Sequence, residues 1–205
     1  NSEAAIAALD YFKTLIPFAP DGVLTYDWAE DANAFAQGKA AMNLQWQNAA
    51  PLCQDPAQST IVDKFNFTLI PGKEKDDGTI NRTPTFGGWG LMIPKDAKNK
   101  EAAWEFIVWA TTAEMEVKLA YSQPGSRYSS LKNPDLAAKY VEYEGMLTSL
   151  PIAKGRPRIA AYSELADALE IAISEAMTGT KDSKTALDNA NTRFTEIMRS
   201  WGLLK

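Results

Sequence analysis

Aromatic rings and planar polar side chains occur together at two places in the sequence. Trp46 is followed directly by Gln47, and Trp89 stands between Gly88 and Gly90. A flat ring can stack against apolar C–H groups, while an amide can hydrogen-bond to hydroxyls. These residue types together suit a sugar or a sugar alcohol, whose surface combines C–H faces with a rim of hydroxyls.

The same residues also have structural interpretations. Trp46 could cover the edge of a sheet, and Trp89 could begin a buried strand beside glycines that let two chain segments cross closely. Arg127 and Arg158 could offer forked donors to adjacent hydroxyls, but arginines more often form surface ion pairs. These alternatives stay open at the level of the sequence.

Other candidate residues are predicted to have no part in chemistry. Trp104, Trp109 and Trp201 fall in apolar helical stripes, so we expect them to pack. Glu142 and Glu144 could act as paired carboxylates of a carbohydrate-active enzyme. Because one residue separates them on a predicted helix, they should point to different sides. A non-catalytic protein is favoured, with the enzyme as the alternative and a helical interaction module as a third possibility.

Composition narrows the function classes further. The 205 residues include no histidine and one cysteine, Cys53. Histidine-based nucleophile activation and ordinary zinc sites are therefore excluded, and we expect no cofactor and no metal. The 21 Lys and Arg residues are scattered and the net charge is -5, so nucleic acid is not a predicted partner. No apolar run is long enough for a membrane helix, so direct membrane insertion is not expected.

Periodicity predicts a helix-rich α/β chain. Short apolar runs predict strands at 40–46, 65–70 and 89–93. Apolar residues at helical spacing predict helices over 3–16, from Asp27, from Asn99, from a Thr111 capping box, over 133–147, from a Ser163 cap to Gly179, and from Ser183 to Trp201. These strands are too few for a sheet that serves so many helices, so the fold should be incomplete.

Five segments, taken in order, carry a family resemblance. They are FAQGKAAMNLQW at 35–46, NFTLIPG at 66–72, TFGGWGLMIPKDAKNKEAAWEFIVWAT at 85–111, QPGSRYSSL at 123–131 and GRPRIAAYSEL at 155–165. The set resembles the second half of family 1 extracellular solute-binding proteins, the maltodextrin-receptor-like carbohydrate and polyol receptors of ABC importers. The GGWGL segment and the helix after it are most similar to receptors for sugar alcohols and small sugars.

The resemblance implies a type II periplasmic-binding-protein-like fold in two lobes, of which this chain is a fragment. It assigns 1–87 and 127–205 to the carboxy-terminal lobe. Residues 91–124 become an excursion into the other, mostly missing lobe, and 87–90 and 123–127 become hinge crossings. With that lobe missing, the excursion should expose an apolar face or bury it by self-association, and the fragment alone should bind sugar poorly.

The resemblance also implies a function. The protein would bind a sugar or polyol in the cleft between the lobes and deliver it to the permease subunits of an ABC importer, without catalysis. It would be periplasmic or extracellular and lipid-anchored, and the opening residues NSEAAIAALD lack the features of a signal peptide. The family often places an aromatic residue towards the ligand where Tyr162 stands. The ligand-binding residues would be Trp46, Gln47, Gly88, Trp89, Arg127, Arg158 and Tyr162.

Overall fold

The computed structural model describes residues 1–122 and 124–204, and these form two compact units. Unit 1 joins Asn1–Asp31 with Pro157–Lys205, and unit 2 comprises Ala32–Arg156. The boundaries of these units differ from those of the predicted lobes. The division into lobes remains a prediction. The two units are described separately below.

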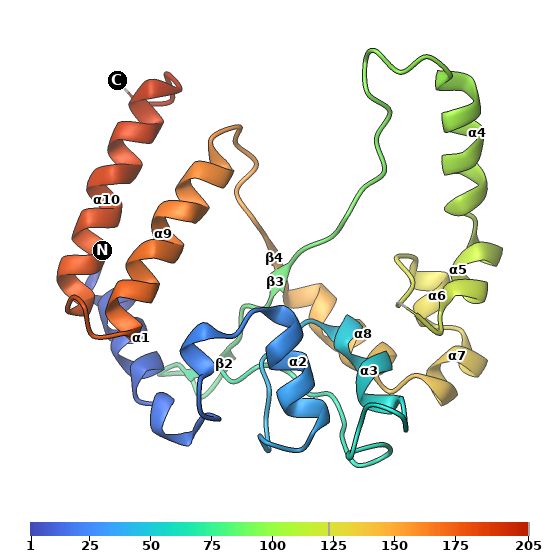
Figure 1. Ribbon diagram of the computed structural model, residues 1–205, viewed down its shortest axis with the longest axis horizontal. Helices are drawn as coiled ribbons and strands as arrows, with labels where there is room; N and C mark the ends of the chain where they lie inside the picture. The colour runs from blue at the N-terminus through green and yellow to red at the C-terminus, as the bar shows by residue number, and fades with distance from the viewer. Residues whose placement is uncertain (123, 205) are drawn as a thin grey trace. The chain divides into compact units, whose positions relative to one another are not determined.

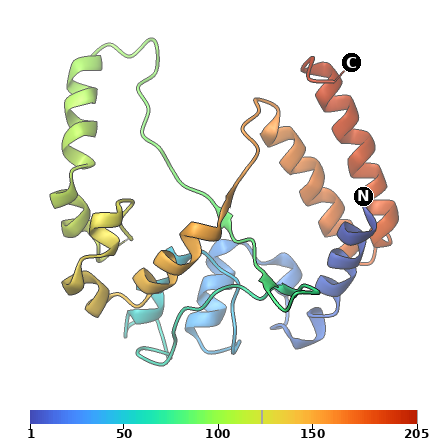
Figure 2. The same ribbon diagram turned by 180° about the vertical axis from the view of Figure 1, so that it is seen from behind.

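Unit 1 is built on three helices, α1 (Glu3–Lys13), α9 (Tyr162–Met177) and α10 (Ser183–Ser200). Helices α9 and α10 run side by side in both views, with α1 against them (Figures 1 and 2). Small side chains dominate the contact and let the helix backbones approach closely. The buried core consists of Leu9, Ala172, Ala176, Ala186, Leu187 and Ala190.

Side-chain caps explain where these helices begin. Ser2 Oγ accepts from the Ala5 N–H at 3.2 Å, and Asp182 accepts from the Thr185 N–H at 2.8 Å. The predicted Ser163 cap is wrong, because the N-cap of α9 is Ala161, two residues earlier, and it makes no side-chain hydrogen bond. Two short 3-10 helices, Ile16–Phe18 and Val23–Thr25, follow α1 in the same unit.

Helix α2 (Trp28–Ala36) begins in unit 1 and continues into unit 2. Gly38 follows it at φ 69°, the left-handed conformation that ends a helix. The chain then reaches a 3-10 turn, η3 (Gln47–Ala49), and helix α3 (Ala50–Gln54).

The strands of unit 2 are only two residues long. Strands β1 (Lys73–Glu74) and β2 (Ile80–Asn81) pair antiparallel, while β3 (Thr85–Phe86) pairs parallel with β4 (Lys154–Gly155). The predicted strands at 40–46, 65–70 and 89–93 are wrong, since all three segments are irregular. A strand needs a hydrogen-bonding neighbour, and an apolar run alone does not supply one.

The rest of unit 2 is a series of short helices. Tyr140 has extended backbone angles, so the single helix predicted over 133–147 is broken there into α7 (Pro134–Lys139) and α8 (Glu142–Ser149). Thr112, rather than Thr111, caps α5 (Ala113–Leu119) by accepting from the Met115 N–H at 3.3 Å. The buried core here consists of Ala120, Leu131, Leu136 and Tyr143. The helices are α4 (Lys100–Ala110), α5 (Ala113–Leu119), α6 (Tyr128–Leu131), α7 (Pro134–Lys139), α8 (Glu142–Ser149) and the 3-10 turn η4 (Leu150–Ile152).

Helix α4 exposes aromatic side chains, and the expectation that its tryptophans pack is wrong for the described chain. Trp104, Phe106 and Trp109 are all exposed. The helix is reached through an extended segment after β3 and contacts α5 (Figure 1). Trp201 on unit 1 is also exposed, and its indole N–H donates to Glu164 Oε1 at 2.8 Å. Among the described helices, none has the length and apolarity to cross a bilayer.

Candidate ligand-binding site

Unit 2 brings two of the predicted ligand residues into contact. The ring centroids of Trp46 and Trp89 are 6.2 Å apart and the ring planes meet at 35°. Trp46 is 40% exposed and Trp89 is 90% exposed. A ligand sandwiched between two rings would need a centroid separation of about 7–8 Å, twice a carbon–carbon contact distance. The pair therefore offers its outer faces as one apolar surface.

The backbone around Trp46 is held by local hydrogen bonds. Its N–H donates to Gln45 Oε1 at 2.7 Å, and its carbonyl accepts from the Ala49 N–H at 3.0 Å. Gln47, the first residue of η3, is half-buried. The neighbouring amide of Asn48 has a buried Oδ1 that finds no hydrogen-bond partner among residues 1–122 and 124–204. One ring and two amides thus lie in three consecutive residues, Trp46, Gln47 and Asn48.

The glycines on either side of Trp89 leave its surroundings open. A Cβ atom added at Gly88 or Gly90 would meet nothing within 4 Å, and neither residue has a left-handed φ. The glycines are thus not needed here for a close chain crossing. The interpretation of Trp89 as the start of a buried strand is wrong, because its ring is almost fully exposed.

Arg127 is engaged elsewhere in unit 2. Its guanidinium donates to the Thr111 carbonyl at 2.5 Å, and its Nε lies 3.6 Å from Glu116 Oε1. Its role towards a ligand stays a prediction. Sequence reasoning missed Glu116, because a lone glutamate on a helix gives no sign of partners ten or more residues away. Gln123, at the start of the predicted crossing, lies outside the described residues.

The remaining predicted ligand residues belong to unit 1. Arg158 is exposed in the loop before α9, and Tyr162 is the half-buried first residue of that helix. Their part in binding stays a prediction, because the structure describes them separately from the tryptophan pair.

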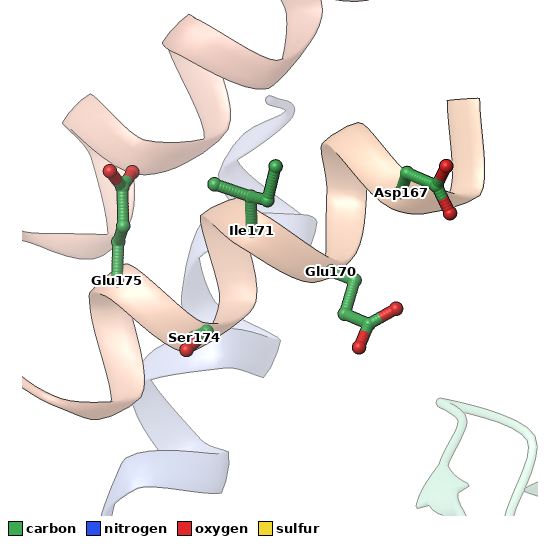
Figure 3. Close-up of a pocket in the computed structure, with 5 residues that line it drawn as sticks. All are labelled: Asp167, Glu170, Ile171, Ser174 and Glu175. Carbon is green, nitrogen blue, oxygen red and sulfur yellow. The ribbon is translucent and has the colours of Figure 1, made fainter. Parts of the chain in front are cut away.

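A shallow hollow of about 400 Å³ lies along α9. Figure 3 shows its side chains, all from that one helix: Asp167, Glu170, Ile171, Ser174 and Glu175. The Glu175 carboxylate is already paired with Lys181 Nζ at 2.9 Å. The hollow has no aromatic surface for stacking, so we do not assign the sugar site to it.

The paired carboxylates of the enzyme alternative do not share a common space. Glu142 is 1% exposed, whereas Glu144 is exposed to solvent. Burial raises the pKa of the Glu142 carboxyl, and its Oε1 has no hydrogen-bond partner in the described chain. The two side chains thus point to different sides of α8, as their spacing predicted, and cannot flank one bond. Residues 1–122 and 124–204 also hold no group of three His, Cys, Asp or Glu side chains suited to a metal.

The fold and the family pattern define the class of protein. Residues 1–117 match the family described as bacterial extracellular solute-binding protein, so the chain belongs to that family. A solved ABC transporter solute-binding protein from Agrobacterium radiobacter K84, in complex with ribitol, superposes with a TM-score of 0.80 at 32% identity and over 94% of this chain. The predicted periplasmic-binding-protein-like fold class is confirmed.

Two curated relatives match in sequence. A mannitol-binding protein of Pseudomonas aeruginosa is 30% identical over 64% of this chain and 31% of its own length. A probable amino-acid ABC transporter periplasmic-binding protein of Sinorhizobium fredii is 22% identical over the whole chain and 46% of its own length. The ribitol complex is covered over 49% of its chain. The chain thus spans about half the length of the proteins that it matches end to end.

Proposed function

We propose that this chain forms part of a site that binds a sugar or a sugar alcohol, with Trp46 and Trp89 as its stacking surface. The exposed contact between these two rings is the observation that carries the proposal. A mannitol-binding relative and a ribitol-bound solved structure support the ligand class. The hollow on α9 offers no comparable surface.

The chemistry of such a ligand explains why rings alone are insufficient. Stacking on an aromatic face contributes about 0.5–1.5 kcal/mol and discriminates little between sugars. A hydroxyl that is desolvated without a partner costs about 1–3 kcal/mol. Selectivity therefore depends on polar groups, for which Gln47, Arg127, Arg158 and Tyr162 are the candidates on this chain.

The whole protein would deliver its ligand to the permease subunits of an ABC importer and would catalyse no reaction. Its place would be the periplasm, or the outer face of a membrane through a lipid anchor. Family membership and the separation of Glu142 from Glu144 support a receptor over an enzyme.

Two lobes belong to the same proposal. Residues 1–87 and 127–205 would form one lobe, 91–124 would reach into the other, and 87–90 and 123–127 would be the crossings. Helix α4 supports this division, because it exposes Trp104, Phe106 and Trp109, and a contiguous group of large apolar side chains is normally covered. In the whole protein, the second lobe would cover the exposed side chains of this helix, since the solved relatives are about twice as long as this chain. Without that lobe, self-association through 91–124 would cover them instead.

The test is a calorimetric panel of sugars and sugar alcohols, including ribitol and D-mannitol, on the native protein. Trp89→Ala and Trp46→Ala should each weaken binding about tenfold, since tenfold in affinity corresponds to about 1.4 kcal/mol. Trp201→Ala is the matched control, because that ring is exposed but belongs to unit 1. Unchanged affinity in both test variants would remove the tryptophan pair from the site, and release of a reaction product would refute the receptor.

A further inference from the structure

One carboxylate in unit 2 accepts several hydrogen bonds from the chain that follows α5. Glu116 lies on α5, and its side chain is 12% exposed. Its Oε1 accepts from Ser126 Oγ at 2.6 Å. Its Oε2 accepts from Ser130 Oγ at 2.6 Å and from the backbone N–H of Arg127 at 3.3 Å. Both oxygens are thus satisfied by one short stretch of chain.

The same carboxylate lies beside the Arg127 guanidinium. Arg127 Nε is 3.6 Å from Glu116 Oε1, while Nη2 donates to the Thr111 carbonyl at 2.5 Å. Thr111 is the residue that ends α4, and a cation is favourable at the carboxyl end of a helix. The two contacts hold the guanidinium at the α4–α5 junction. Its side chain nevertheless stays 50% exposed.

Gly125 shows how closely the segment fits around this carboxylate. A Cβ at Gly125 would lie 2.8 Å from Ser130 Cβ and 3.1 Å from Glu116 Oε2. The residue does not have a left-handed φ, so space rather than backbone conformation requires glycine here. Any larger residue would push the segment away from Glu116.

The charge of Glu116 is maintained by its partners. Burial alone would raise the pKa of this carboxyl, but the hydrogen bonds from Ser126, Ser130 and the Arg127 N–H, together with the Arg127 charge, lower it below its ordinary value. The carboxylate is therefore ionised at neutral pH. Its interactions are lost only when the pH falls through that lowered pKa.

We infer that Glu116 is a positioning residue that fixes segment 125–127 and sets the direction of the Arg127 guanidinium, so that its exposed side can meet a ligand hydroxyl. Only this last step rests on the proposed sugar site. Glu116 itself would not touch the ligand, because both of its oxygens are already occupied.

Glu116→Gln tests the positioning directly. Hydrogen bonds to a charged group contribute about 1.5–3 kcal/mol, so the Arg127 amide should exchange with solvent about tenfold faster or more. The Arg127 Nε–H resonance of the wild type should shift as the carboxylate is protonated in acid, and this shift should be absent in the variant. A glutamate with a merely structural role would not make this particular resonance titrate.

Two further variants keep the test decisive. Gly125→Ala disturbs the same contact from the other side and should also speed exchange of the Arg127 amide. Glu114→Gln is the matched control, since Glu114 lies on the same helix, is 76% exposed and pairs with Lys118 at 2.6 Å. Unchanged Arg127 exchange in both test variants, or an equal change in the control, overturns the inference.

The ligand-directed step has its own measurement. In calorimetry with D-mannitol and ribitol, Glu116→Gln and Arg127→Ala should each weaken binding, and the double variant should be no weaker than Arg127→Ala alone. Additive losses would overturn the link between the two residues. Failure of the wild type to bind any sugar or sugar alcohol would overturn the proposed function and this step, while the exchange and resonance data would still decide whether Glu116 positions Arg127.

Discussion

Replacing Glu142 by Gln should stabilise the protein at neutral pH. The Glu142 side chain is 1% exposed, and its Oε1 has no hydrogen-bond partner in the part of the chain that the structure describes. Burial raises the pKa of this carboxyl above its ordinary value. The folded state therefore holds this proton more tightly than the unfolded state does.

The sign and size of the effect follow from this difference. Below the unfolded pKa of about 4.3 both states are protonated, and the Glu142 contribution is fully present. As the pH rises from there to the raised folded pKa, stability falls by up to about 1.4 kcal/mol per pH unit. Glutamine cannot ionise and avoids this loss. The variant should thus gain about 1 kcal/mol or more over the wild type by pH 7, and nothing near pH 4.

Urea unfolding at several pH values between 4 and 7.5, followed by circular dichroism, measures the difference between the two proteins. Glu144→Gln is the control, because this carboxylate lies on the same helix but is exposed to solvent. A constant difference between wild type and Glu142→Gln would refute the reasoning. So would a variant that is less stable at pH 7.

Two other changes test the packing of unit 2. Gly145→Ala should destabilise by about 1–2 kcal/mol in urea unfolding, because its Cβ would lie 2.7 Å from Phe67 Cβ and overpacking outweighs the gain in helix propensity. Gly90→Ala, which meets nothing within 4 Å, should change little, and equal effects would contradict the packing argument. Cys53 is buried and burial raises the pKa of its thiol, so a thiol reagent should label it only after unfolding; rapid labelling of the folded protein would disprove this.

The sequence was sufficient to predict features that depend on residues close together along the chain. The last helix was predicted from Ser183 to Trp201 and is observed over Ser183–Ser200, because apolar spacing and a cap are both local. Opposite orientations of Glu142 and Glu144 also followed from helical geometry alone. The ordered segments likewise predicted the family, and the match over residues 1–117 confirms it.

Features that join distant segments were decided by the tertiary structure. The runs at 40–46, 65–70 and 89–93 have the composition of strands but are irregular in the structure. A strand forms only where another part of the chain supplies its backbone hydrogen bonds. Trp46 and Trp89 were each predicted as ligand residues, yet their contact at 6.2 Å could not be read from the sequence. Glu116 was missed for the same physical reason. The sequence reveals that a carboxylate lies on this helix, but its serine and arginine partners reach it only when the segment beyond α5 folds back onto the helix.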